Sequence, residues 1–210
     1  MGSTPASAVT TRESSPLLDP STVLAALFED DRREHASVPA VGTPQYVALR
    51  ERDGARRARA EDALAALASS GAPSAEDLYH AASLFQHGET AADAYRAHTL
   101  AGDSAARGHA PARWLYAAAY DRWCMYEGRP QRYGTQIVPD GVRYRVWDVD
   151  PATTDAERAE HDVPPLAEQE RRAAELSRNA PQPPMHGAPE WLRGALERWH
   201  GDGGASGRRR

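Results

Sequence analysis

Residues 121–141 read DRWCMYEGRPQRYGTQIVPDG, and within this stretch the chain changes from a helical pattern to a β-rich one. The helical pattern ends near Gly128, since a glycine commonly follows the last turn of a helix. Two β-rich segments follow at 133–138 and 142–149, and a Pro-Asp-Gly turn at 139–141 separates them. The stretch therefore predicts a β-hairpin that follows directly on a helix.

The same stretch gathers hydrogen-bonding side chains beside the helix end, at Gln131, Tyr133, Thr135 and Gln136. Successive side chains of a regular strand point to opposite faces, so Tyr133 and Gln136 cannot both line one pocket. At least one polar residue of this group is therefore expected to be structural, with Gln131 and Thr135 tying the hairpin to the helix. The functional interpretation gives Tyr133 or Gln136 a role in orienting a ligand.

Capping residues divide the rest of the chain into helices. Ser74 and Asp77 form a capping-box pattern, and Thr90 is suited to cap the next helix. Gly88 is expected to be the C-cap between these two helices. A first helix starts at Asp19-Pro20-Ser21. The further helices are expected at about residues 45–68, 74–87, 90–108, 111–128, 154–161, 166–177 and 189–199.

The section at 74–128 contains an internal similarity. Leu78, Ala81 and Ala82 align with Trp114, Ala117 and Ala118 at an offset of about 36 residues, in the range of helical-hairpin repeats. With small residues on facing helices and glycines at the turns, this section resembles Sel1-like repeats. The resemblance implies antiparallel helical hairpins, and an ordinary helical bundle is the alternative.

The fold predicted from these patterns is mainly α-helical, with one β-hairpin and a helical C-terminal tail. We expect a single domain at 18–200, with its core at 45–165. The small, polar segments 1–17 and 201–210 are expected to be disordered.

Composition excludes several classes of function. All 25 basic residues are arginine, so no side chain can form a lysine Schiff base or a phosphate-loop lysine contact. The net charge is −5, and the only basic run is at 208–210, so nucleic-acid binding is not expected. No apolar run reaches the roughly 18 residues of a membrane span, and the N-terminus lacks the apolar run of a signal peptide.

The single cysteine, Cys124, excludes an internal disulfide and fits a cytoplasmic protein. Its place on an apolar helix face indicates inert packing rather than a nucleophile. No strand-linked G-x-G-x-x-G motif indicates a nicotinamide or flavin, so no cofactor is predicted.

Asp121 lies on the apolar stripe of the helix that precedes the hairpin, where a carboxylate needs a partner. Arg122 or another arginine is the expected partner. In the preceding helix His98 lies on a stripe of alanines, and one helix earlier His80 and His87 share a face. Each histidine taken alone is more often a structural residue. The apolar stripe around Asp121 consists of Trp114, Ala117, Ala118, Cys124 and Met125.

A series of motifs resembles a bacterial family of uncharacterised domains. The motifs are Phe85-Gln86-His87-Gly88, Ala97-His98, Ala112-Arg113-Trp114-Leu115, Asp121-Arg122, Gly128-Arg129-Pro130-Gln131 and Tyr133-Gly134-Thr135-Gln136. Members of the family share a Q-H-G or Q-H segment, a D-R helix and a Q-x-Y-G-T-Q end, and the match covers about 50–165. The resemblance implies that the following residues belong together: His87, His98, Asp121, Arg122, Gln131, Tyr133, Thr135 and Gln136.

Two main functions compete. In a small enzyme acting on a polar small molecule or peptide, His87 or His98 would be the general acid or base, and Asp121 would orient it. The substrate would then be bound by Arg122, Gln131, Tyr133, Thr135 and Gln136. In a helical interaction module that binds a protein or peptide, the same residues would form a buried structural network.

A third interpretation has His87, His98 and Asp121 bind iron or zinc. Their spacing matches no tight metal-binding motif, so no metal is predicted.

Overall fold

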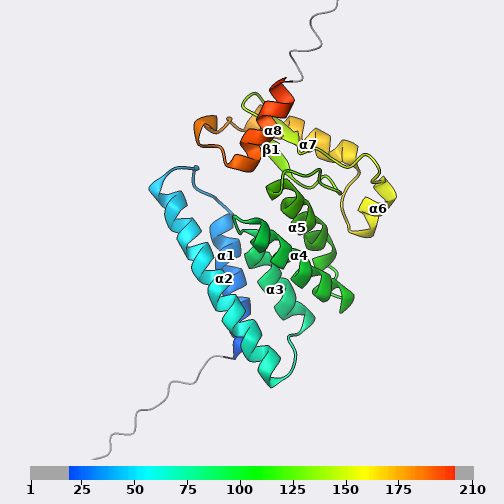
Figure 1. The fold of residues 1–210 in the computed structure, drawn as a ribbon. Coiled ribbons are helices and arrows are strands. Elements are labelled where there is room, and N and C mark those ends of the chain that lie inside the picture. The colour runs from blue at the N-terminus through cyan, green and yellow to red at the C-terminus, as the bar shows by residue number, and fades with distance from the viewer. Residues whose placement is uncertain (1–18, 202–210) are drawn as a thin grey trace, which may run out of the picture.

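The structure is a computed structural model that describes residues 19–201. Five helices, α1 to α5, form a lower tier, and a β-hairpin with three further helices forms an upper tier (Figure 1). The elements are α1 (Pro20–His35), α2 (Pro44–Ser70), α3 (Ala75–Gln86), α4 (Ala91–Ala106), α5 (Ala112–Tyr126), β1 (Ile137–Pro139), β2 (Tyr144–Val146), α6 (Asp155–Glu160), α7 (Leu166–Asn179), the 3₁₀ turn η1 (Met185–Gly187) and α8 (Glu190–Gly201).

The predicted fold class is confirmed: residues 19–201 are mainly helical, with one antiparallel hairpin and a helical C-terminal part. The disorder predicted for 1–17 and 202–210 lies outside the described residues. Gly201 belongs to the end of α8 and not to a tail. No helix within 19–201 combines the length and the apolar character that a membrane crossing requires.

The predicted helix starts are confirmed where capping residues indicated them. Asp19 accepts a hydrogen bond from the N–H of Thr22 at 3.1 Å and begins α1. The Ser74 box of α3 is complete, because Ser74 N–H donates to Asp77 at 2.8 Å and Asp77 N–H donates back at 3.1 Å. Such side-chain caps satisfy the N–H groups that have no partner inside the helix.

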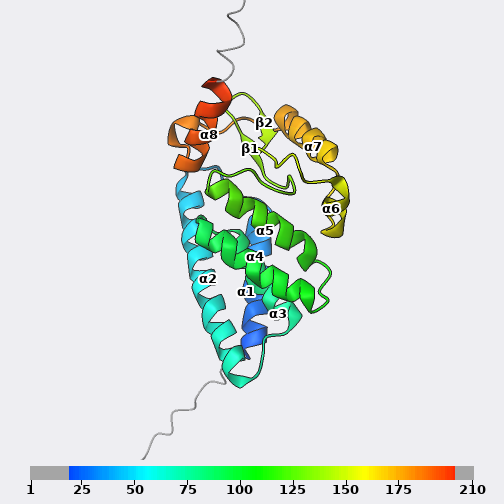
Figure 2. The same cartoon turned by 45° about the vertical axis from the view of Figure 1, so that its right-hand side comes forward.

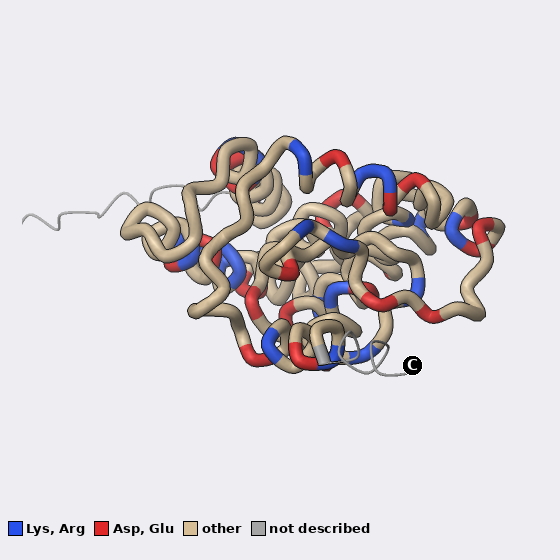
Figure 3. The backbone as a smooth tube through the Cα atoms, turned by 90° about the horizontal axis from the view of Figure 1, so that it is seen from above, with Lys and Arg blue, Asp and Glu red and all other residues tan. Residues whose placement is uncertain are grey.

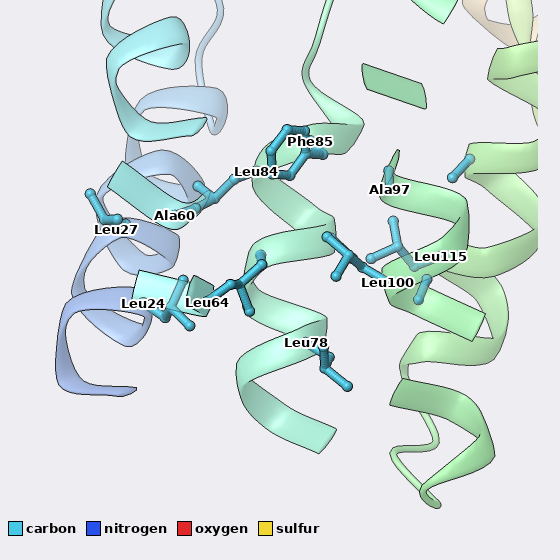
Figure 4. Close-up of a cluster of buried hydrophobic side chains, with 14 of the residues drawn as sticks. Leu24, Leu27, Ala60, Leu64, Leu78, Leu84, Phe85, Ala97, Leu100 and Leu115 are labelled. Atoms are coloured by element: carbon cyan, nitrogen blue, oxygen red, sulfur yellow. The ribbon is translucent and has the colours of Figure 1, made fainter. Parts of the chain in front are cut away.

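Helix α3 is the centre of the lower tier, because it contacts α1, α2, α4 and α5. Leucines from all five helices fill the core (Figure 4), and fully buried alanines lie where α3, α4 and α5 meet. Small residues at these positions let the helix axes approach closely. Consecutive helices joined by short loops pack on one another, as hairpins do, and the resemblance to Sel1-like repeats stays a prediction.

The upper tier has its own core around Trp147, which is 0 % exposed. Helix α8 covers the hairpin (Figure 2), and Leu192 and Ala195 of α8 join the cluster that contains Trp147. The indole N–H donates to the carbonyl of Arg129 at 2.8 Å, so this buried donor is satisfied. On the other side, the Ser177 hydroxyl on α7 donates to Tyr144 O of β2 at 3.1 Å.

The hairpin is shorter than predicted. Residues 137–139 pair with 144–146, and Val138 lies opposite Arg145, whereas the expected strands ran over 133–138 and 142–149. The backbone N–H groups of Tyr133 and Thr135 bond to Asp121 of α5, and that of Gln136 bonds to the Gln131 side chain, so these groups are not available to a partner strand. The turn is as predicted: Asp140 accepts two backbone N–H groups, and Gly141 has a φ of 89°.

Charged residues of both signs are interspersed along the described part of the chain (Figure 3). Several pairs join neighbouring helices, and one example is Arg96 of α4, whose Nε lies 2.8 Å from the Glu61 carboxylate of α2. Exposed pairs of this kind stabilise a fold by less than about 1 kcal/mol each. The two apolar cores are therefore the main source of stability.

Gly88 is not the C-cap that the sequence suggested, because His87 is the C-cap of α3. The glycine is required for a different reason: a Cβ at position 88 would overlap the side chain of Asp93. Asp93 accepts from the Thr90 hydroxyl at 2.7 Å in the capping box of α4. The close approach of the chain to this box leaves no room for a side chain at Gly88.

We predict that Gly88→Ala lowers the free energy of unfolding by about 2 kcal/mol, since Asp93 must move and the cap of α4 is weakened. The matched control is Gly54→Ala within α2, where no neighbouring atom lies closer than 4.0 Å to the added Cβ. That substitution should raise the free energy of unfolding by about 0.5–1 kcal/mol, because alanine restricts the unfolded chain. Urea unfolding of both variants measures the difference, and equal effects would contradict the steric argument.

Candidate functional site

The loop after α5 is folded around the carboxylate of Asp121, which is 0 % exposed. Oδ1 accepts the backbone N–H groups of Arg132 and Tyr133 at 2.8 and 2.9 Å. Oδ2 accepts the N–H and the hydroxyl of Thr135 at 2.9 and 2.8 Å. Burial raises the pKa of Asp121, and these four donors act against that shift.

The prediction that an arginine side chain pairs with Asp121 is therefore wrong. Arg132 contributes its backbone N–H, while its guanidinium bonds to Glu157 at 2.8 Å. Both carboxylate oxygens of Asp121 already accept two hydrogen bonds each from residues of one short loop. This arrangement fastens the loop to α5 and leaves Asp121 no oxygen directed at a histidine.

The side chains of Gln131 and Gln136 also connect the loop to its neighbours. The Gln131 amide donates to the carbonyls of Gln136 and Trp147 at 3.1 and 2.9 Å, and its oxygen accepts the Gln136 N–H at 2.8 Å. The Gln136 amide donates to Ala118 O of α5 at 3.1 Å. These side chains are buried, and their bonds join α5, the loop and the hairpin.

Two potentially reactive groups near this loop are in unreactive states. Burial raises the pKa of the Tyr133 hydroxyl to about 12, and that hydroxyl lies 3.3 Å from His161 Nε2. Cys124 is buried with a free thiol, and burial raises its pKa, which lowers the fraction of reactive thiolate.

His98 occupies a separate place between α4 and α5. Its Nδ1 lies 3.1 Å from Tyr116 O, so Nδ1 carries the proton and donates to that carbonyl. The rings of Tyr116 and Tyr120 lie 4.1 and 5.3 Å from its own, between ring centres. Burial lowers the pKa of His98, which favours the neutral form.

His87 lies in a third place, at the end of α3, and its partner is Asp31 of α1. His87 Nδ1 is 2.7 Å from Asp31 Oδ2, and a carboxylate only accepts, so Nδ1 donates. The His87 ring stacks on that of His35, with ring centres 3.7 Å apart and planes at 11°. Arg50 donates to the His87 carbonyl and holds its backbone.

His87 and Asp31 line an open pocket of about 560 Å³ between α1, α3 and α5. Phe28, Tyr79 and Trp114 form aromatic parts of its wall. Trp114 is 42 % exposed, so its predicted place on the buried apolar stripe of α5 is wrong. The first turn of α5 places Trp114 at the pocket and not in the core.

Two residues that line this pocket each have a buried polar atom without a hydrogen-bond partner among the described residues. These atoms are Oε1 of Gln86, a residue that is only 7 % exposed, and the buried Nε of Arg122. An unsatisfied buried polar atom costs about 1–3 kcal/mol, and such atoms are rare in folded proteins. Both residues line the pocket, so a movement of their side chains would let a bound molecule supply the missing bonds.

The residues predicted to belong together thus divide into three groups. His87 and Arg122 share the pocket; His98 lies between α4 and α5; Asp121 holds the loop with Gln131, Tyr133, Thr135 and Gln136. The sequence interpretation missed Asp31 and His35. Their spacing of four residues at the end of the first helix was the available signal, because it places both on one helix face.

No protein-family model, curated protein or solved structure matches the chain. The resemblance to a bacterial family therefore stays a prediction, and the function has to be argued from the residues themselves.

We predict that Asp121→Asn lowers the free energy of unfolding by about 3 kcal/mol or more, because an amide NH₂ would face donors that then lack an acceptor. For a chain of this size the melting temperature should fall by roughly 6–12 °C. Asp103→Asn, on the exposed surface of α4, is the control and should change the melting temperature little. A small effect of Asp121→Asn in thermal unfolding would show that the loop is held by other contacts.

A second prediction concerns pH. Burial lowers the pKa of His80, His98 and His161 from the ordinary value of 6.5. Below about pH 6.5 the unfolded chain therefore binds more protons than the folded one, and the free energy of unfolding falls as the pH decreases from about 7.5 to about 5.5.

The variant His98→Asn should reduce this slope, because one buried histidine is removed, whereas the exposed His200→Asn should leave it unchanged. Denaturant unfolding at several pH values gives the slope, and stability that rises on acidification through this range would refute the prediction.

Proposed function

We propose that this protein binds a small polar molecule with an anionic group in the pocket between α1, α3 and α5, and that His87 exchanges a proton with it. One observation carries the proposal: Gln86 and Arg122, each with an unpartnered buried polar atom, line one pocket together with a histidine that a buried aspartate orients. The chain would act in the cytoplasm as a small enzyme or as a ligand-binding protein.

The contact between His87 and Asp31 supports a role in proton transfer. The carboxylate fixes the proton on Nδ1 and leaves Nε2 as the free acceptor of the ring. The His87 side chain is 31 % exposed, so a molecule in the pocket can reach it. A positioned imidazole of this kind contributes typically about 10²–10⁴-fold to a reaction rate.

Arg122 and Gln86 support recognition of a polar ligand. A guanidinium with a free N–H suits a carboxylate or phosphate, and the Gln86 oxygen can accept from a hydroxyl or amine. The ring faces of Phe28, Tyr79 and Trp114 offer apolar contact for the rest of the molecule. Of the residues that the sequence suggested for the site, we assign Arg122 and His87 to the pocket. The residues of the loop after α5 have a structural role instead.

The alternative proposal is a helical module that binds a protein or peptide. The hydrogen bonds to Asp121 favour this alternative, because the loop residues that make them stabilise the fold and do not face a ligand. In that case the exposed ring of Trp114 would be the anchor for a partner side chain.

The test is a thermal-shift screen of the full chain against small carboxylates and phosphates, followed by titration of any stabilising compound. We predict that Arg122→Gln weakens its binding by about tenfold or more, since one charge-assisted bond is lost. Arg113→Gln on the same helix is the matched control, because Arg113 is exposed and pairs with Asp162.

A stabilising compound whose affinity is the same in the wild type and in Arg122→Gln would place its site elsewhere and refute the proposal. If no small compound shifts the melting temperature and a peptide library yields a binder sensitive to Trp114→Ala, the interaction module is correct.

A further inference from the structure

We propose that Asp31, His35 and His87 form a binding site for one divalent transition-metal ion of the Zn²⁺ or Fe²⁺ class. One potential ligand atom from each residue lies within 4.8 Å of the others. The inference deepens the proposed function, because the ion would lie in the same pocket. Metal binding itself does not depend on the proposed function. Only the idea that the ion helps to hold the anionic molecule rests on it.

Local structure brings the three side chains together. Asp31 and His35 are four residues apart in the last turns of α1, so they project from one helix face. His87 caps the C-terminal end of α3. A helix C-terminus carries partial negative charge, and two such ends meeting at one place favour a bound cation.

The distances suit a small ion. Ligand atoms about 2.0–2.1 Å from a tetrahedral ion lie roughly 3.3–3.4 Å from one another. Asp31 Oδ2 is 2.7 Å from His87 Nδ1, and Asp31 Oδ1 is 3.7 Å from His35 Nε2. These two distances differ from the required spacing by less than about 1 Å. The three ligand atoms lie within 4.8 Å of one another, so the stacked rings would have to tilt for their nitrogens to converge.

The charge around Asp31 is also favourable. A network of ion pairs surrounds it, in which four carboxylates meet three guanidiniums. The carboxylates are Asp31, Glu34, Asp53 and Glu89, and the guanidiniums are Arg50, Arg52 and Arg56. Among these seven side chains the carboxylates outnumber the guanidiniums by one, which favours a cation at this place.

Asp31 has fewer hydrogen bonds than Asp53, the other buried carboxylate of this network. Among the described residues its only side-chain hydrogen bond is the one with His87, and Arg56 Nε lies 3.4 Å away without forming one. By contrast, Asp53 bonds to Arg50 and Arg56 at 2.7 and 2.5 Å. Asp53 can therefore give up its 3.2 Å contact with His35 Nε2 when that nitrogen turns to an ion.

The ligand set selects the class of metal. Two imidazoles and one carboxylate suit Zn²⁺, Fe²⁺ or Co²⁺, whereas Mg²⁺ and Ca²⁺ prefer oxygen ligands. Three protein ligands leave at least one coordination position open. Since the cluster lines the pocket, that position would be available to water or to an oxygen of the molecule bound near Arg122. The ion would take the place of the proton on His87 Nδ1, and that proton would move to Nε2. In the metal-bound form His87 would therefore donate to the molecule and not accept from it.

The first experiment titrates the full chain, stripped of metal with a chelator, with Zn²⁺, Co²⁺ or Mg²⁺ in a calorimeter. We expect Zn²⁺ and Co²⁺ to saturate at one ion per chain and Mg²⁺ not to bind. Bound Co²⁺ should also give the visible absorption bands of a four- or five-coordinate ion, which show direct coordination by the protein in the wild type without any substitution. Failure of the wild type to bind one ion per chain overturns the proposal.

The second experiment repeats the titration with His35→Gln and His87→Gln, each checked for folding by circular dichroism. Each should weaken Zn²⁺ binding by about 100-fold or more, since even the loss of a residue that only supports a ligand costs 10–100-fold. His161→Gln is the matched control, because it removes a half-buried histidine outside the cluster. Unchanged affinity in either cluster variant overturns the three-residue site.

Arg122→Gln separates this inference from the proposed function. That variant should keep its Zn²⁺ affinity and lose affinity for the anionic compound. If no ion binds while an anionic compound still depends on Arg122, the metal site is wrong and the ligand pocket stands. If ions bind but no compound depends on Arg122, the pocket function is wrong and the metal site stands.

Discussion

The buried carboxylate of Asp121 is the interaction on which the upper tier depends. Four donors from the loop at 132–135 converge on it, and the same loop positions Gln131, whose amide connects both sides of the hairpin. A carboxylate buried this deeply is tolerated only when both of its oxygens accept hydrogen bonds. The hairpin, and with it α8, is therefore placed relative to α5 by electrostatics rather than by apolar contact alone.

Helix α5 serves two purposes through adjacent residues. Successive residues of a helix point in directions about 100° apart, so Asp121 faces the loop while Arg122 faces the pocket. The Asp-Arg pair thus links the scaffold to the candidate site within a single turn. A change on the loop side of α5 would also move Arg122, which makes the loop relevant to the pocket although it contributes no ligand-binding atom.

The sequence predicted local features well because their causes are local. Helix starts at Ser74 and Thr90 follow from capping side chains three residues away, and the turn at 139–141 follows from its own residues. The partner of Asp121 could not be identified, because backbone N–H groups carry no residue identity. The contact between Asp31 and His87 joins residues 56 positions apart, and helical periodicity does not say which faces of distant helices meet.

The distribution of tryptophans makes the two tiers optically distinguishable. Trp147 lies fully buried with its ring centre 5.8 Å from that of Trp191 and 5.3 Å from that of Trp199. The short distances allow excitation to transfer among these three rings, and Trp147 emits from a dry environment. Trp114, at the rim of the pocket, emits from a wetter environment. Undocking of α8 and occupation of the pocket would therefore alter different parts of one emission spectrum.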